Sequence, residues 1–169
     1  MRAGARSAAT IGVLGVLLLV GALWGWSAMT EPFPGKADPA LCEDQPVAEG
    51  EKVFPEQVVV SVFNAGDRQG LAAQTMAMLQ RRGFQVGESG NTSRGEDVAR
   101  VQVWTDDRHN PAALLVARQL GSRVPVVEKR KTPGAGVAVI VGDGFDKLVR
   151  GPRKIVARSD AEICSPPVS

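Results

Sequence analysis

Hydrophobic positions follow different patterns along the chain, and each pattern predicts a different kind of element. Residues 11–28 form an almost unbroken apolar run without a charged side chain. A run of about 18 or more apolar residues is long enough to cross a bilayer as a helix. Shorter apolar runs with strand or helix periodicity begin at residue 58, and a Pro-rich stretch lies between. The pattern therefore predicts a membrane helix, a linker and one folded domain.

The predicted membrane helix has a basic start and an aromatic end. Two arginines lie within residues 1–10, and Trp24 and Trp26 lie near the end of the apolar run. Basic flanks stay in the cytoplasm, and aromatic rings settle at the membrane interface. We therefore predict a cytoplasmic N-terminus (1–10), an uncleaved single-pass anchor in the cell membrane (11–29), and an extracytoplasmic remainder. A cleaved signal peptide is the alternative, although the two tryptophans occupy the place of a small-residue cleavage site.

The stretch after the anchor is predicted to be a stalk. Five prolines and seven acidic residues fall within residues 30–56. Proline breaks helices and central strands, and acidic side chains keep a linker solvated. Residues 57–164 then form the predicted extracytoplasmic domain, and residues 165–169 form a tail.

Within the domain, the order strand, helix, strand occurs twice before a last strand. A β-branched run indicates a strand buried on both faces, and an apolar stripe with a C-terminal Gly indicates each helix. The predicted strands are 58–63, 84–86, 99–104, 124–127 and 137–141, with a further edge strand at 155–157; the helices are 70–82 and 110–120, and residues 87–95 are a loop. We predict an α+β fold with a βαββαβ-like order, in which two helices pack on one face of a mixed four- or five-stranded sheet.

The charge distribution argues against nucleic acid as a partner. The net charge is +2, and residues 57–169 carry sixteen Lys and Arg against eleven Asp and Glu. This basic excess is small, it is spread over loops and helices, and no recognised nucleic-acid-binding motif accompanies it. We expect no nucleic-acid partner.

The two cysteines bracket the predicted domain. Cys42 precedes its first strand, and Cys164 lies near the chain end. Thiols outside the cytoplasm tend to be oxidised, and two cysteines allow one intramolecular pairing. We predict a Cys42–Cys164 disulfide; two free or intermolecular thiols are the alternative.

Short motifs in the domain resemble the C-terminal domain of LytR-type (LytR/CpsA/Psr) envelope proteins. The resemblance covers residues 58–145, and the matching segments are 58–66 (VVVSVFNAG), 70–72 (GLA), 79–84 (LQRRGF), 112–121 and 137–145. Larger family members carry a domain that transfers wall polymers onto peptidoglycan, and we expect no counterpart of it here. The chain is similar in plan to the small actinobacterial envelope-integrity proteins of the Cei group. The resemblance implies envelope maintenance through wall-assembly proteins, peptidoglycan or another wall polymer.

The sequence offers no catalytic set. The single histidine, His109, lies in a polar turn, and Ser61 lacks the Gly-x-Ser-x-Gly context of a nucleophile elbow. Asp143 and Asp146 suit a cation, but Gly-Asp-Gly is first a turn sequence. We therefore expect no catalytic residue, no metal site and no cofactor, and we rate a hydrolase or transferase lowest.

The best candidate binding site is the turn before the first helix, which contains Asn64, Gly66 and Gly70. Backbone N–H groups at a helix start favour an anionic or carbonyl ligand. The alternative is a structural turn in which Asn64 bonds its own backbone and Gly66 adopts positive φ. Trp104, expected at an exposed strand end, is the one candidate for stacking on a sugar. It supports a second hypothesis, a peptidoglycan glycan-binding domain of SPOR-like plan, although aromatic residues are scarce.

Overall fold

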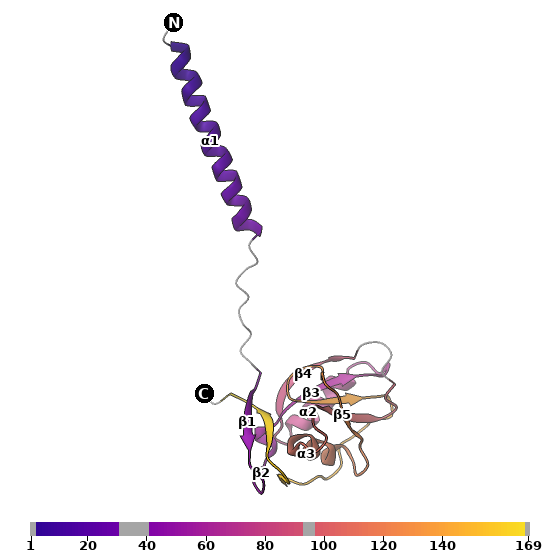
Figure 1. Cartoon of the computed structure of the whole chain (residues 1–169). Helices are drawn as coiled ribbons and strands as arrows, with labels where there is room; N and C mark the ends of the chain where they lie inside the picture. The colour runs from indigo at the N-terminus through magenta and orange to yellow at the C-terminus, as the bar shows by residue number, and fades with distance from the viewer. Residues whose placement is uncertain (1–2, 31–40, 93–96, 168–169) are drawn as a thin grey trace. The chain divides into compact units, whose positions relative to one another are not determined.

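The computed structural model describes residues 3–30, 41–92 and 97–167. The chain divides into two compact units, the first built around helix α1 (Ala3–Thr30) and the second comprising the strands and remaining helices (Figure 1). Residues 1–2, 31–40, 93–96 and 168–169 lie outside the described part, and so does the first part of the stretch predicted to link anchor and domain.

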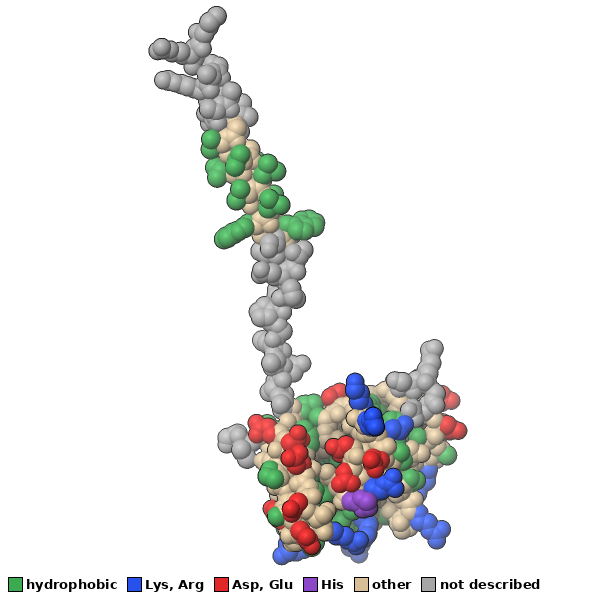
Figure 2. Space-filling model, in the orientation of Figure 1, with side chains coloured by type: hydrophobic (Ala, Val, Ile, Leu, Met, Phe, Trp, Pro, Cys, Tyr) green, Lys and Arg blue, Asp and Glu red, His purple; other side chains and the backbone are tan. Residues whose placement is uncertain are grey.

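Helix α1 confirms that the apolar run is helical. Side chains are described for residues 12–26, and their large hydrophobic members are exposed to between 54 and 83 % (Figure 2). Within the described residues, the structure contains no helix of the length and apolarity needed to cross a membrane.

The second unit is built on a five-stranded mixed sheet in the order β4-β3-β7-β5-β6. Strand β3 pairs in parallel with β4 and with β7, β5 pairs in parallel with β6, and β5 and β7 are antiparallel. The bounds are β3 Val59–Asn64, β4 Gln85–Asn91, β5 Val101–Thr105, β6 Val126–Glu128 and β7 Val137–Val141. The predicted α+β class, with a mixed five-stranded sheet, is confirmed.

Both helices cover one face of this sheet, as predicted. Helix α2 (Leu71–Gln80) and helix α3 (Pro111–Leu120) bury Leu79 and Leu115 fully in a core that also contains alternate residues of β3, β5 and β7. Asn110 begins α3 by accepting a hydrogen bond from the Ala112 N–H at 2.9 Å, and Pro111 follows at the first helical position. The apolar stripes of the two helices therefore fix which face of the sheet they occupy.

The opposite face of the sheet is buried as well, as the β-branched run at 58–63 predicted for its own strand. Phe63, Trp104 and Ile140 form a second, smaller core with Val98 and Ala138. Trp104 was expected at an exposed strand end, but it is only 5 % exposed. The chain before β7 covers this face, since a Cβ at Gly134 would lie 3.1 Å from the Phe63 ring.

The prediction that the stalk extends to residue 56 is wrong for its last part. Strands β1 (Glu43–Val47) and β2 (Lys52–Val53) and the 3-10 helix η1 (Pro55–Gln57) belong to the folded unit. Strand β1 pairs with β9 (Ala161–Ser165), and β2 pairs with β8 (Ile155–Val156), both antiparallel. Val47 and Val53 enter the main core, so apolar burial outweighs the acidic and proline-rich composition that suggested a linker.

Two further boundaries differ from the prediction. Strand β4 continues to Asn91, through most of the predicted loop at 87–95. A register shift opposite Ser61 accommodates the extra residue in β4, and the Ser61 hydroxyl accepts a hydrogen bond from the Glu88 N–H at 3.0 Å. The strand predicted at 155–157 exists as β8, but it pairs with β2 rather than with the main sheet.

Candidate functional site

The turn between β3 and α2 holds three of the predicted binding residues. The Asn64 side chain accepts a hydrogen bond from the Gly66 N–H at 3.0 Å and donates one to the Arg68 carbonyl at 2.9 Å. Gly70 precedes α2 with φ 75°, a left-handed conformation that glycine adopts without strain. Asn64 therefore bonds its own turn, as the structural alternative predicted.

An internal carboxylate occupies the backbone donors of this turn. The two side-chain oxygens of Asp143 accept hydrogen bonds from the Asp67 N–H at 3.2 Å and the Arg68 N–H at 2.9 Å. The prediction that Gly66 has positive φ is wrong. Its small size matters instead, because a Cβ there would lie 2.8 Å from the Asp143 backbone nitrogen and overlap its carboxylate. The anion that this turn favours is thus supplied by the chain itself.

Arg68 ties the same turn to the chain after β7. One guanidinium nitrogen, Nη1, donates to the carbonyls of Asp143 and Phe145, both at 2.8 Å, and lies 3.2 Å from the Asp146 carboxylate. The Asp146 side chain is largely exposed, so this ion pair adds little stability by itself. The contacts of Arg68 and Asp143 together join two turns that lie far apart in the sequence.

Asp143 is expected to make stability depend on pH below about pH 5. Backbone hydrogen bonds from Arg68 and Asp67 hold the pKa of Asp143 below its ordinary value of 3.8. A carboxyl with a lowered folded-state pKa contributes stability that is present above its unfolded pKa and is lost as the pH falls through the folded value. Asp143→Asn should therefore be less stable than the wild type at pH 6, and this difference should shrink towards pH 3. Urea unfolding at both pH values measures it.

The matched control for Asp143→Asn is the same change at exposed Asp97, which should leave the pH dependence of unfolding as in the wild type. If the stability difference between Asp143→Asn and the wild type were the same at pH 3 and pH 6, the carboxylate would not be the group responsible.

Trp104, the other predicted binding residue, is not exposed. Its ring lies in the second core with 5 % exposure, and its Nε1 donates to the Gln102 side-chain oxygen at 3.0 Å. The Lys129 ammonium nitrogen lies 4.4 Å from the ring centroid, which is the geometry of a cation–π contact. The expectation of an exposed aromatic platform is wrong because residues outside the strand cover this face of the sheet.

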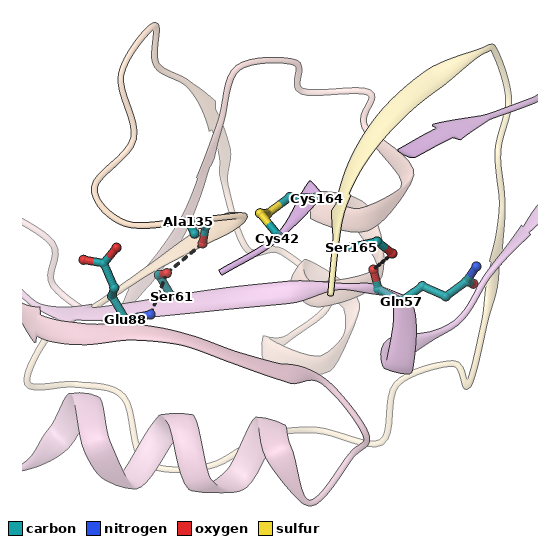
Figure 3. The surroundings of a disulfide bond; sticks show 7 residues. All are labelled: Cys42, Gln57, Ser61, Glu88, Ala135, Cys164 and Ser165. Atoms are coloured by element: carbon teal, nitrogen blue, oxygen red, sulfur yellow. Dashed lines mark hydrogen bonds between the residues drawn. A yellow bond between two sulfur atoms is a disulfide. The ribbon is translucent and has the colours of Figure 1, made fainter. Parts of the chain in front are cut away.

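The predicted disulfide is confirmed. Cys42 and Cys164 are bonded across a sequence separation of 122 residues (Figure 3). The bond joins the chain just before β1 to β9, and the neighbouring Ser165 hydroxyl donates to the Gln57 carbonyl at 2.6 Å. Both ends of the folded unit are therefore held together covalently and by hydrogen bonds.

The remaining reactive side chains have structural partners. The buried Ser61 hydroxyl donates to the Ala135 carbonyl at 2.7 Å, as Figure 3 shows. The His109 side chain is exposed at 78 % and lies 3.5 Å from the Asp107 carboxylate. Among the described residues, no three His, Cys, Asp or Glu side chains are grouped closely enough to hold a metal ion.

A cavity lined by four arginines was not anticipated as a site. This arginine cleft has a volume of about 820 Å³ and is lined by Arg81 and Arg82 from the end of α2, Arg150 and Arg153 from the segment after β7, Glu56 from η1, and Phe54. Arg81 and Arg82 follow the last turn of α2, where a cation suits the negative end of a helix dipole. The signal that was available is the absence of any acid between Lys147 and Arg158, a segment that carries five basic residues (Lys147, Arg150, Arg153, Lys154, Arg158).

A buried glutamine fixes both walls of the arginine cleft. Gln119, 2 % exposed, accepts a hydrogen bond from Arg82 Nη1 at 3.1 Å and donates to the Pro152 carbonyl at 2.7 Å. A Cβ at Gly151 would lie 2.6 Å from the Gln119 side-chain carbon, so the 150–153 segment presses directly on α3. The Arg82 side chain and the backbone of residues 150–153 are therefore both held by Gln119 of α3.

Comparison with known proteins gives one family and one similar structure. The family model described as "LytR cell envelope-related transcriptional attenuator" (LytR_C) matches residues 57–145. A similar solved structure is the soluble domain of a conserved hypothetical secreted protein, an Rv2700 ortholog, from Mycobacterium marinum. It shares 22 % identity, with a TM-score of 0.47, and the match covers 60 % of this chain and 77 % of that one. The search of the curated proteins found no match.

Proposed function

Because the matched residues 57–145 are more than half of its 169 residues, the chain belongs to the LytR_C family, and we propose that it is a non-catalytic, membrane-anchored module that supports cell-envelope integrity. In this proposal the folded unit lies outside the cytoplasm and binds wall-assembly proteins or a wall polymer. Binding rather than a chemical step is the proposed activity.

One observation carries the preference for binding. The arginine cleft presents four guanidinium groups, and Arg82 among them is held by Gln119, while several described side chains that could serve as nucleophile or base are engaged in the fold. Both cysteines are in the disulfide, Ser61 is buried with two hydrogen bonds, and Asp143 is held by backbone N–H groups. A pocket of about 300–1,000 Å³ with a few fixed polar groups is typical of a binding site.

The disulfide and helix α1 support the proposed location. Disulfides persist in oxidising compartments and are rare in the cytoplasm, so Cys42–Cys164 favours the extracytoplasmic side. Apolar side chains such as Leu18 and Trp24 project from α1 with exposures of 74 and 83 %, which is costly in water and favourable in lipid. In the proposal, residues 11–29 form the single-pass anchor, with the N-terminus inside.

The alternative of a sugar-stacking, SPOR-like glycan-binding domain is not favoured. That hypothesis depended on Trp104 as an exposed platform, and the ring is buried in the second core. Phe54, with 40 % exposure, lines the arginine cleft. The other lining residues there include four arginines and no second aromatic ring.

The experiment that tests this function compares strains with and without the gene. Loss of the gene should increase sensitivity to detergents or to antibiotics that act on the wall, and the full-length chain should restore resistance. A version in which residues 1–30 are replaced by a cleavable secretion signal should restore less, since the proposal requires the anchor. Equal resistance of the strain without the gene would contradict the envelope role.

The binding mode is tested with the purified full-length chain in dodecyl maltoside. Saturable co-sedimentation with purified sacculi would support wall polymer as the partner, and in-cell cross-links to membrane proteins would support wall-assembly proteins. Absence of both would contradict the proposal that the module acts by binding.

A further inference from the structure

We propose that the arginine cleft binds a phosphoryl-containing ligand with at least two negative charges in total, a specificity that rests on the proposed binding function and goes beyond it. The cleft collects cations from two elements that are distant in the sequence. Arg81 and Arg82 end α2, and Arg150 and Arg153 belong to the segment after β7. Glu56 is the single acid among the lining residues, so the lining has a net charge of +3, from four arginines against one glutamate.

Helix electrostatics account for only half of these arginines. Cations stabilise the negative end of a helix dipole, which is reason enough for Arg81 and Arg82 at the end of α2. Arg150 and Arg153 follow β7 and have no such reason. Gathering like charges around one cavity is unfavourable, so an anionic ligand is the natural partner for the second pair.

These side chains are not neutralised within the described part of the chain. Arg81, Arg150 and Arg153 are exposed, and among the described residues none of them has an acidic partner within 4 Å. Arg82 is held by the neutral Gln119 oxygen rather than by a carboxylate. The cleft therefore keeps its positive charge available to a ligand.

The rigidity of the base favours a specific site over a diffuse basic surface. The hydrogen bonds of Gln119 link Arg82 to the carbonyl of Pro152, and the Val149 N–H donates to the Gln119 carbonyl at 2.8 Å. Arg150 and Arg153 flank the Gly151–Pro152 pair, so the backbone that carries them is anchored to the same glutamine that holds the Arg82 side chain. A preorganised set of donors loses less entropy on binding.

Guanidinium chemistry selects the ligand class. A planar guanidinium forms two parallel hydrogen bonds with a phosphate or carboxylate, and Arg is favoured wherever this geometry is used. A monocarboxylate has one charge to share among four arginines, whereas a diphosphate or consecutive phosphodiesters have two or more. Phe54 and the two prolines of the lining offer an apolar edge for the group that bears the phosphates.

The test measures binding of inorganic pyrophosphate to the full-length chain in dodecyl maltoside by isothermal titration calorimetry. We expect one saturable site per chain. The double variant Arg150→Gln/Arg153→Gln should bind at least tenfold more weakly. Its matched control is Arg100→Gln/Arg123→Gln, which removes the same charge from exposed arginines outside the cleft and should change affinity less than twofold.

Two further ligands identify the source of the phosphoryl group. Soluble poly(glycerol phosphate) represents a phosphodiester polymer, and monomeric dihexanoyl phosphatidic acid represents a lipid headgroup. Stronger binding of either one, lost in Arg150→Gln/Arg153→Gln, supports the proposal and names the source. Absence of saturable pyrophosphate binding, or equal weakening by both double variants, overturns it.

This outcome is separable from that of the proposed function. If the chain restored envelope resistance and bound sacculi or membrane proteins but not pyrophosphate, the phosphoryl specificity would fail and the binding module would stand. If Arg150→Gln/Arg153→Gln lost pyrophosphate binding and also failed to restore resistance while the control double variant restored it, both would be supported.

Discussion

Replacing both cysteines, as in Cys42→Ser/Cys164→Ser, is expected to lower the free energy of unfolding of the folded unit by about 5 kcal/mol. The bond closes a loop of 122 residues, and the chain-entropy model gives about 5 kcal/mol for a loop of this length. The loss should be large relative to the whole stability, because domains of this size are stable by only about 5–15 kcal/mol. The double variant should therefore be partly unfolded at 37 °C.

The measurement is urea unfolding of the full-length chain in dodecyl maltoside, followed by Trp104 fluorescence with Trp24 and Trp26 replaced by Phe. Wild-type protein reduced with dithiothreitol is the control and should match the double variant. The variant itself should not respond to the reductant. A destabilisation below 1 kcal/mol, or a variant that still responds to reductant, would contradict the role assigned to the bond.

The disulfide contributes more than the closure of a loop, because of where its ends lie. Strand β1 pairs with β9 over five residues, from Glu43 with Ser165 to Val47 with Ala161. The bond stands at the outer end of this ladder, next to the terminal pair. Without it, we expect the ladder to fray from that end. Cys42 and Cys164 also line a second pocket together with Thr105 of β5, and fraying would open this pocket to solvent.

Truncating the fully buried Phe145 to Ala is expected to destabilise the folded unit by about 3–5 kcal/mol, the range found for large-to-small changes at buried aromatic residues. Phe145 follows the turn after β7, and its ring belongs to the main core under α2 and α3. Removing the ring loses its transfer free energy and leaves a cavity among residues held in place by the sheet. The same urea titration measures the change.

Phe54→Ala is the matched control for Phe145→Ala. It removes the same atoms from a ring that is 40 % exposed, and we expect a loss below about 1 kcal/mol, since part of that ring already contacts water. The Phe54 N–H would still donate to the Gln57 side chain, because that hydrogen bond comes from the backbone. Similar losses for the two variants would mean that the ring of Phe145 is not the centre of the core that its burial indicates.

Phe145 also connects the core to the predicted binding turn. The Arg68 guanidinium donates to the carbonyl of Phe145 and to that of Asp143, whose carboxylate occupies the donors of the β3–α2 turn. Both acceptors are backbone carbonyls that Phe145→Ala retains, so we expect this variant to keep the pH dependence that Asp143 imposes on unfolding. The turn that the sequence offered as a binding site therefore also joins two segments that are far apart in the chain.

Local sequence determined several of the helices and strands of this protein. The β-branched run at 59–63 specifies a strand buried on both faces, and Asn110-Pro111 specifies a helix start. Pro125 directly precedes β6, which lies at the edge of the sheet. These features depend on neighbouring residues and on side-chain periodicity, which a sequence displays directly. Two cysteines around one domain likewise allowed a single intramolecular pairing, which the structure contains.

Tertiary structure decided everything that depends on which distant segments meet. Only the fold shows that residues 43–57 join the domain, since their strands exist by pairing with 155–165. Only the fold shows that Trp104 is covered, that Asp143 fills the turn beside Gly66, and that Arg81 and Arg153 share one cleft. Burial and charge proximity are properties of pairs far apart in the chain, so they arise when the core closes and no local pattern encodes them.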